Sequence, residues 1–341
     1  MNLAEIKGIR SLLSKPQKIA IVTHRNPDGD AYGSSLALYH YFKNENHQVT
    51  VVSPNDCPDF LKWMPGQEEI VIFEKNTAEG TKILQEAQIV FVLDFNAFHR
   101  VGREMQTVLE KIDPVYFLID HHQEPDGFAK YTYVDVEVCS TCQMIYQFFE
   151  KLEVLPKINK DIATCLYTGI LTDTGSFRFP STSSKTHLIT ADLLDKGVAH
   201  DKVYNRIHEN SIDRLKLLGK ALSNMEVIKK YHTAYITLTN RELRNFNYKK
   251  GDTEGFVNYA LSLSGIKLAV IFIEDQQQGI IKMSFRSIGD FSVNELARKY
   301  FSGGGHINAA GGRSEKSLKE TVSDFLDVLP EYEEQLNYKY E

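Results

Sequence analysis

Acidic and imidazole side chains that could carry chemistry follow three apolar runs of this sequence, at 18–22, 88–93 and 115–119. The residues that come after these runs are His24, Asp28, Asp30, Asp94, Asp120, His121 and His122. For any one of these aspartates, a turn or a helix cap is the simplest explanation. Their recurrence after three separate runs favours a shared site instead.

Carboxylates that converge on one site need compensating charge. Their mutual repulsion would keep several of them protonated unless cations neutralise them, and two divalent ions would supply that charge. Carboxylate and imidazole ligands without thiolate favour Mn²⁺ or Mg²⁺ over structural zinc, and the share of histidine favours Mn²⁺. We therefore predict two Mn²⁺ ions, with Mg²⁺ as the alternative.

The loop HRNPDGDAYGSS contains the turn that this site requires. Pro27 and Gly29 favour a turn that lets Asp28 and Asp30 point to different ions. A helix that opens near Gly33 would bring its first amides close to a bound phosphate. A fourth acidic segment, LTDTGSFRF, adds Asp173 after a helix that ends near residue 170. By itself, this segment is equally well explained by a helix stop and a turn.

The elements that must position these residues form an α/β pattern. Apolar runs at 18–22, 48–53, 88–93 and 115–119 alternate with crossover-sized segments, including a helix predicted over 33–43. This pattern is typical of buried parallel strands in a doubly wound, mainly parallel sheet. In such a sheet the carboxyl ends of the strands form the ligand crevice, which is where the acidic and imidazole residues fall.

The second half of the chain predicts a smaller α/β domain with a mixed sheet. Helical spacing runs from about 139 to 225, and strand patterns return from about 231. We predict a catalytic domain over 1–210, a helical linker over 211–228 and a substrate-binding domain over 229–341.

Composition narrows the class of protein. The 341 residues exceed what one core usually organises, and the net charge of −6 argues against binding long duplex nucleic acid. No apolar stretch approaches a membrane span, so we expect a cytoplasmic protein without membrane contact. The four cysteines form no disulfide framework, and the CxxC pair Cys139 and Cys142 is interpreted as structural.

Five motifs occur in a fixed order: THRNPDGD, the aspartate of VLDF, DHH at 120–122, TDTGSF, and GGGH at 303–306. Together they resemble the DHH phosphoesterase superfamily, in the branch with a C-terminal DHH-associated domain. Members of that branch act as short-oligoribonucleotide nucleases and 3'-phosphoadenosine 5'-phosphate phosphatases. The resemblance covers about residues 19 to 312.

The resemblance implies two sets of metal ligands, with the bridging residues Asp94 and Asp173 in both. One ion would be held by His24, Asp28, Asp94 and Asp173. The other would be held by Asp30, Asp94, His121 and Asp173. Asp120 would orient a ligand imidazole, and His122 would face the scissile phosphate.

In the second domain, the resemblance implies a substrate-binding segment. Arg286 and Ser287 lie in SFRS, and Gly303, Gly304, Gly305 and His306 lie in SGGGHINAAGG. The bare glycine amides could form an anion nest, with Arg286 and His306 on a second phosphate or a base. A flexible glycine loop is the structural alternative. Ser302 stands where the family often has another glycine, and we expect it to tune the loop.

The predicted function is hydrolysis of short oligonucleotides to mononucleotides, of 3'-phosphoadenosine 5'-phosphate to AMP, or of both. The alternatives are a linear or cyclic dinucleotide phosphodiesterase, a RecJ-like single-strand exonuclease, a manganese pyrophosphatase, and a nucleotide-binding regulator without turnover. The expected partners are small nucleotides, and a homodimer is the alternative to a monomer. The sequence leaves open the preferred substrate, RNA against DNA, and the direction of attack.

Overall fold

The computed structural model describes residues 3–337. The chain divides into two compact units, Met1–Glu209 and Asn210–Glu341. Each unit is built around its own six-stranded sheet. The fold class predicted from the sequence, a mainly parallel α/β sheet followed by a smaller mixed one, is confirmed.

The sheet of the first unit is entirely parallel, in the order β3-β2-β1-β4-β5-β6. Its strands are β1 (Lys18–Val22), β2 (Gln48–Ser53), β3 (Val71–Ile72), β4 (Ile89–Leu93), β5 (Val115–Asp120) and β6 (Tyr131–Val134). The chain reverses its direction of travel across the sheet between β1 and β4, and a ligand crevice is expected beside the carboxyl ends of two such strands. The strands β3 and β6 extend the predicted set.

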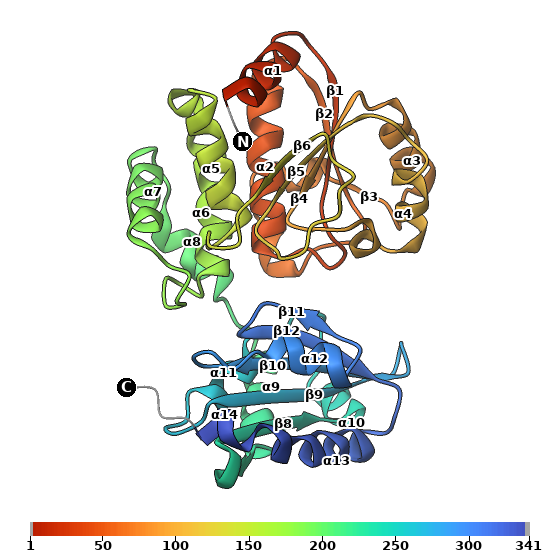
Figure 1. Ribbon diagram of the computed structural model, residues 1–341, viewed down its shortest axis with the longest axis vertical. Coiled ribbons are helices and arrows are strands. Elements are labelled where there is room, and N and C mark those ends of the chain that lie inside the picture. The colour runs from red at the N-terminus through yellow and green to blue at the C-terminus, as the bar shows by residue number, and fades with distance from the viewer. Residues whose placement is uncertain (1–2, 338–341) are drawn as a thin grey trace. The chain divides into compact units, whose positions relative to one another are not determined.

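Helices cover both faces of this sheet (Figure 1). One face packs against α2 (Gly29–Asn44), α5 (Thr141–Lys151) and α6 (Lys160–Asp173), and the other against α3 (Thr77–Glu86) and α4 (Arg103–Leu109). The unit also contains α1 (Leu3–Leu13), α7 (Ser184–Asp195) and α8 (His200–Ile207). The helix predicted over 33–43 begins earlier, at Gly29, because Asp28 caps it.

Glycines let α2 and α6 approach backbone to backbone. A Cβ atom at Gly33 would lie 2.6 Å from the carbonyl oxygen of Cys165, and one at Gly169 would lie 3.0 Å from Cα of Asp30. No real Cβ makes the first of these contacts, so Gly33 is required by this packing. The close packing brings the first turn of α2, with Asp30, beside the last turns of α6, which ends at Asp173.

The sheet of the second unit is mixed, in the order β11-β12-β10-β9-β8-β7. Its strands are β7 (Glu226–Ile228), β8 (Thr233–Leu238), β9 (Leu268–Asp275), β10 (Ile280–Ser287), β11 (Gly304–Gly305) and β12 (Ala309–Ser314). Only β8 and β9 pair in parallel. The helices are α9 (Ile212–Ser223), α10 (Asn240–Asn245), α11 (Phe256–Leu261), α12 (Val293–Tyr300), α13 (Leu318–Val328) and α14 (Glu333–Asn337).

The segment predicted as a linker, 211–228, forms α9 and β7. Leu217 and Ala221 of α9 are fully buried in a core that includes Ala234 and Phe256 of the second unit. By its packing, this segment belongs with the second sheet.

Within residues 3–337, no helix combines the length and apolar character that crossing a membrane requires. All four cysteines are buried and carry free thiols. Cys142 lies on α5 and Cys139 just before it, and the Cys139 thiol donates to Oε1 of Gln143 at 3.1 Å.

Candidate metal centre

The loop after β1 brings an imidazole to the sheet edge. Nε2 of His24 lies 3.4 Å from Oδ2 of Asp94 and 4.0 Å from Oδ2 of Asp28. Nδ1 of His24 lies 2.9 Å from the carbonyl oxygen of Arg25. Because a carbonyl only accepts, Nδ1 carries the proton of the neutral ring, and Nε2 is left toward the carboxylates as a metal ligand would be.

The two carboxylate oxygens of Asp28 make different contacts. Oδ1 accepts from the amides of Asp30 and Ala31 at 3.0 Å each, so Asp28 is the N-cap of α2. Oδ2 is the atom that faces His24. The helix-cap explanation and the ligand prediction are therefore compatible at this position.

Three carboxylates lie close to the imidazole of His121. Nε2 of His121 lies 3.8 Å from Oδ2 of Asp30, 3.5 Å from Oδ1 of Asp94 and 3.3 Å from Oδ2 of Asp173. Nδ1 of His121 lies 3.2 Å from the carbonyl oxygen of Val138 and is fixed as a donor in the same way as Nδ1 of His24. The loop after β5, the start of α2, the loop after β4 and the end of α6 thus meet at one point.

Asp94 lies between the two imidazoles. Its Oδ2 faces His24 and its Oδ1 faces His121. Asp94 belongs to three groups of ligand atoms that lie close enough to hold a cation: His24–Asp28–Asp94, Asp30–Asp94–His121 and Asp94–Asp120–His122. The first two share only Asp94, through its two different oxygens. Its backbone is left-handed, with φ of +65°, a conformation that costs an aspartate energy and that clusters at functional sites.

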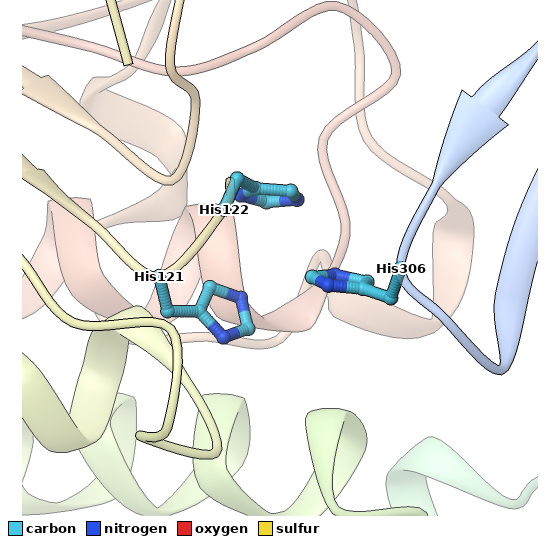
Figure 2. Close-up of side chains that lie close together, drawn as sticks. All are labelled: His121, His122 and His306. Carbon is cyan, nitrogen blue, oxygen red and sulfur yellow. The ribbon is translucent and has the colours of Figure 1, made fainter. Parts of the chain in front are cut away.

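The hydrogen bond of Asp120 shows which imidazole this carboxylate orients. Oδ1 of Asp120 accepts from Nδ1 of His122 at 2.7 Å, and the Asp120 carboxylate is fully buried. The imidazole that Asp120 orients is therefore His122, rather than an imidazole predicted as a metal ligand. Figure 2 shows His122 next to His121 on the segment after β5, with the two ring centroids 4.9 Å apart.

Thr141 is a contributor that the sequence reasoning missed. It opens α5, and its hydroxyl donates to Oδ1 of Asp94 at 3.0 Å. Its amide and that of Cys142 donate to the two carboxylate oxygens of Asp30, at 2.6 and 2.8 Å. A helix N-terminus holds an anion well, so α5 fixes Asp30 in place. The available signal was Ser140, an N-cap residue before an apolar-periodic segment.

Burial and mutual charge shift the pKa values of these groups in opposite directions. Burial, then the charge of Asp94, raises the pKa of Asp30 to about 8, and burial with the charge of Asp30 raises that of Asp173. Burial alone would raise the pKa of Asp94, but hydrogen bonds from His121 and His24 hold it well below its usual range. Burial alone would lower the pKa of His24, but Asp94 and Asp28 raise it to about 9.

The cluster has the composition of a cation site. Within residues 3–337, the ion pairs of Asp30, Asp94 and Asp173 are with histidines alone. Oδ2 of Asp120 is buried without a hydrogen-bond partner in the same described part of the chain. Carboxylates outnumber imidazoles, and the donor atoms are oxygen and nitrogen without thiolate. This set fits divalent cations of the Mn²⁺ or Mg²⁺ type.

Comparison with known proteins decides the family. The model of the DHH family, N-terminal domain, matches residues 18–170, and that of the DHHA1 domain matches residues 229–335. The bifunctional oligoribonuclease and PAP phosphatase NrnA of Thermus thermophilus is 31% identical over 293 residues, which are 86% of this chain and 83% of that protein. The chain belongs to the DHH family. It is a hydrolase that acts on phosphate ester bonds, in a family that depends on divalent metal ions.

Two further comparisons extend along most of this DHH-family chain. The NrnA of Bacillus subtilis, also a bifunctional oligoribonuclease and PAP phosphatase by name, is 29% identical over 85% of this chain and 88% of its own length. A crystal structure of an exopolyphosphatase-related protein from Bacteroides fragilis superposes with a TM-score of 0.94 at 38% identity. That match covers 99% of this chain and 98% of the other.

In the DHHA1 region, β10 ends in the predicted residues Arg286 and Ser287. Nη1 of Arg286 donates to the carbonyl oxygen of Phe285 at 2.9 Å. The hydroxyl of Ser287 donates to the carbonyl oxygen of Phe291 at 2.6 Å and accepts from Nδ2 of Asn308 at 2.9 Å. Ser287 is buried and is engaged in holding the neighbouring turn.

The glycine segment differs from the predicted anion nest. The amide of Gly303 donates to the carbonyl oxygen of Ala297 at 3.1 Å, and that of Gly305 donates to Oδ1 of Asn294 at 2.9 Å. These two amides are therefore not bare. The glycines serve close approach instead, because a Cβ atom at Gly303 would overlap the carbonyl oxygen of Gly311 on β12. His306, drawn in Figure 2, follows β11.

Ser302 has a left-handed backbone, with φ of +45°. A glycine would adopt this conformation without strain, whereas a serine adopts it less readily. The tuning effect expected of Ser302 stays a prediction.

Proposed function

We propose that this DHH-family enzyme uses two Mn²⁺ ions to hydrolyse short oligonucleotides to mononucleotides and 3'-phosphoadenosine 5'-phosphate to AMP. The observation that carries the proposal is the position of Asp94, whose two oxygens face two different groups of ligand atoms. A centre with shared carboxylates suits phosphate ester hydrolysis, in which attacking and leaving oxygens both need stabilisation. The relatives named as oligoribonucleases and PAP phosphatases support this substrate class.

The proposed ligand sets add Asp173 to the two clusters that share Asp94, as the resemblance to the DHH family implies. His24, Asp28, Asp94 and Asp173 would hold one ion, and Asp30, Asp94, His121 and Asp173 the other. Asp173 fits the second set directly, since its Oδ2 lies 3.3 Å from Nε2 of His121. When bound, the ions supply Lewis-acid activation of water and of the phosphoryl oxygens.

The protein's own groups then complete the chemistry. Asp120 engages Nδ1 of His122 and so orients this ring beside the proposed metal ligands. Thr141 and the start of α5 keep Asp94 and Asp30 in position while charge changes at phosphorus. This arrangement needs little reorganisation during the reaction.

We further propose that Arg286, Ser287 and the Gly303–His306 segment bind the part of the substrate away from the reacting phosphate. Arg286 and His306 would contact a phosphate or a base, and Ser287 would hold the turn beside them. A charge-assisted contact is worth about 1.5 to 3 kcal/mol, so Arg286→Ala should lower kcat/KM on dinucleotides by roughly ten- to a hundredfold. Lys282→Ala, on the same strand β10, is the matched control.

The small diester bis-p-nitrophenyl phosphate separates binding from catalysis in that experiment. It has no distant phosphate or nucleobase, so Arg286→Ala should cleave it almost as well as the unaltered enzyme does. Equal damage to both substrates would assign Arg286 to folding or to catalysis instead.

One experiment tests the proposed function as a whole. Labelled RNA and DNA of two to about twenty nucleotides would be offered to the enzyme with Mn²⁺, Mg²⁺ or Zn²⁺, alongside 3'-phosphoadenosine 5'-phosphate. We expect turnover that is fastest on the shortest RNA, requires a divalent ion and is best with Mn²⁺. Turnover restricted to cyclic dinucleotides or to pyrophosphate, or to long strands, would contradict the proposal.

A further inference from the structure

The segment that follows Asp173 is tied tightly to the end of α6. Five successive amides, from residues 175 to 179, donate within the segment or to the last turn of the helix. The acceptors are the carbonyl oxygens of Thr172, Leu171 and Thr174 and the hydroxyl of Thr174, at 2.8 to 3.1 Å. The hydroxyl of Thr174 in turn donates to the carbonyl oxygen of Ile170 at 2.6 Å. This is a fixed structure rather than a loose connection.

The fixed segment contains three consecutive left-handed residues. Gly175, Ser176 and Phe177 have φ of +54°, +63° and +66°. The conformation is free for glycine but unfavourable for serine and especially for phenylalanine. Such strain persists only where the surroundings enforce it, and it clusters at functional sites.

The rings of Phe177 and Phe179 leave the strained turn in different surroundings. The ring of Phe177 packs between Tyr167 and His187, with centroids 6.4 and 5.4 Å away. The ring of Phe179 lies against Gly175, where a Cβ atom would come within 2.6 Å of it. Phe177 is an internal anchor, whereas Phe179 is 36% exposed.

An arginine completes the exposed group. Arg178 is exposed, and its guanidinium lies over the Phe179 ring, 5.4 Å from the centroid. A single exposed phenylalanine needs no explanation. Here, however, a strained backbone with five hydrogen-bonded amides presents an aromatic ring and a guanidinium plane from the helix end that carries Asp173.

We propose that Arg178 and Phe179 form a stacking platform for a nucleobase of the substrate held at the carboxylate cluster. This inference rests on the proposed function and specifies how that site recognises a nucleotide. Nucleobases stack on aromatic rings and on guanidinium planes with little preference for sequence. The platform would favour substrates that carry a base near the reacting phosphate over phosphate esters that carry none.

The test compares substrates and variants in one cycle. The substrates are 5'-phosphorylated diadenylate and its two abasic counterparts, each lacking one base. The unaltered enzyme should lose about 5- to 100-fold in kcat/KM, mainly through KM, when the stacked base is missing. Phe179→Ala should lose the same factor on the diadenylate and should lose nothing further on that abasic substrate, and Arg178→Ala should behave similarly.

Two variants control for structural effects. Phe179→Trp keeps a stacking surface and should retain the preference for the base. Leu188→Ala alters a residue on α7 that is 72% exposed and should leave every rate unchanged. Thermal melting of each variant confirms that the exposed substitutions leave the fold intact.

The outcomes separate the two proposals. If the unaltered enzyme cleaves the diadenylate but Phe179→Ala slows the diadenylate and both abasic substrates equally, the platform is wrong and the proposed function stands. If neither abasic substrate is slower than the diadenylate, the platform is also wrong. If the unaltered enzyme cleaves no dinucleotide, the proposed function fails and the inference fails with it.

Discussion

The carboxyl edge of the parallel sheet and the glycine segment of the second unit are built by opposite means. At the first, acidic and imidazole side chains from several elements approach within 4.0 Å of one another in a largely buried setting. At the second, backbone carries the structure, with Gly303 and Gly305 paired to Ala297 and Asn294. The first region depends on the carboxylates and imidazoles that it contains. The second depends on glycines, because a Cβ atom would clash with the neighbouring backbone. Loss of a group should therefore damage the first, and addition of a methyl group the second.

The largest effect is expected at Asp94. Asp94→Asn keeps the shape but removes charge from both groups of ligand atoms, and should lower kcat by about 10³-fold or more at saturating Mn²⁺. Asp28→Asn, which touches one group only, is the matched comparison and should cost about 10- to 100-fold. Rates on a dinucleotide and counts of bound Mn²⁺ check both. Activity of Asp94→Asn within tenfold of normal would exclude a shared ligand.

A pH effect of intermediate size should accompany metal binding. With a pKa of about 9 for His24 and about 8 for Asp30, both groups hold protons at pH 7 in the metal-free protein. Mn²⁺ must displace these protons, so its affinity should rise about tenfold per pH unit for each proton released. Calorimetry in buffers of different ionisation enthalpy measures this release. Binding that releases no proton at pH 7 would contradict the ligand assignment.

The same shifts fix the sign of the stability change. His24, with its pKa raised above the ordinary 6.5, stabilises the metal-free fold fully below that pH, and this contribution is lost as pH rises through 9. The contribution of Asp30 is present below 3.8 and is lost as pH rises through 8. The gap in melting temperature between Mn²⁺-loaded and metal-free protein should therefore widen from pH 6 to pH 9. An equal difference in melting temperature at pH 6 and at pH 9 would contradict this prediction.

A smaller loss is expected from Thr141, which sharpens the comparison by removing a single hydrogen bond from the first region. Thr141→Val retains the volume but loses the hydroxyl that donates to Asp94, and should reduce kcat/KM or Mn²⁺ affinity by about 10- to 100-fold. Thr141→Ser restores the hydroxyl and should restore most of the function. Equal behaviour of the two variants would mean that Thr141 contributes packing alone.

The smallest effect should come from added atoms in the second region. Gly303→Ala drives a methyl group into the backbone of β12, at a cost of about 1–3 kcal/mol, and should lower the melting temperature by several degrees. Gly304→Ala meets nothing closer than 3.5 Å and should melt as the unaltered protein does. Calorimetric melting distinguishes them. Similar melting of both would contradict the close-approach explanation.

Local sequence patterns predicted the parts of this molecule that depend on local rules. The strands at 18–22 and 48–53 have the predicted bounds, because continuous apolar runs report burial on both faces. His24, Asp94 and His121 were expected at one edge because the carboxyl ends of parallel strands meet there. The role of Thr141 was not predicted, because its partner Asp30 is 111 residues away and no local pattern encodes that pairing. The hydrogen bonds donated by Gly303 and Gly305 were also missed, although their acceptors are nearby in the sequence, because a glycine-rich segment does not show which of its amides are already paired.

The contact between α2 and α6 has a consequence for how the centre could change during evolution or design. Gly169 lies against Asp30, where a Cβ atom would come 2.8 Å from Oδ1 of that carboxylate. The separation of Asp30 and Asp173 is thus set by how closely two helices approach, and one side chain at 169 would act as a spacer between them. A residue that is not itself a candidate ligand would in this way influence how far apart two candidate ligands lie.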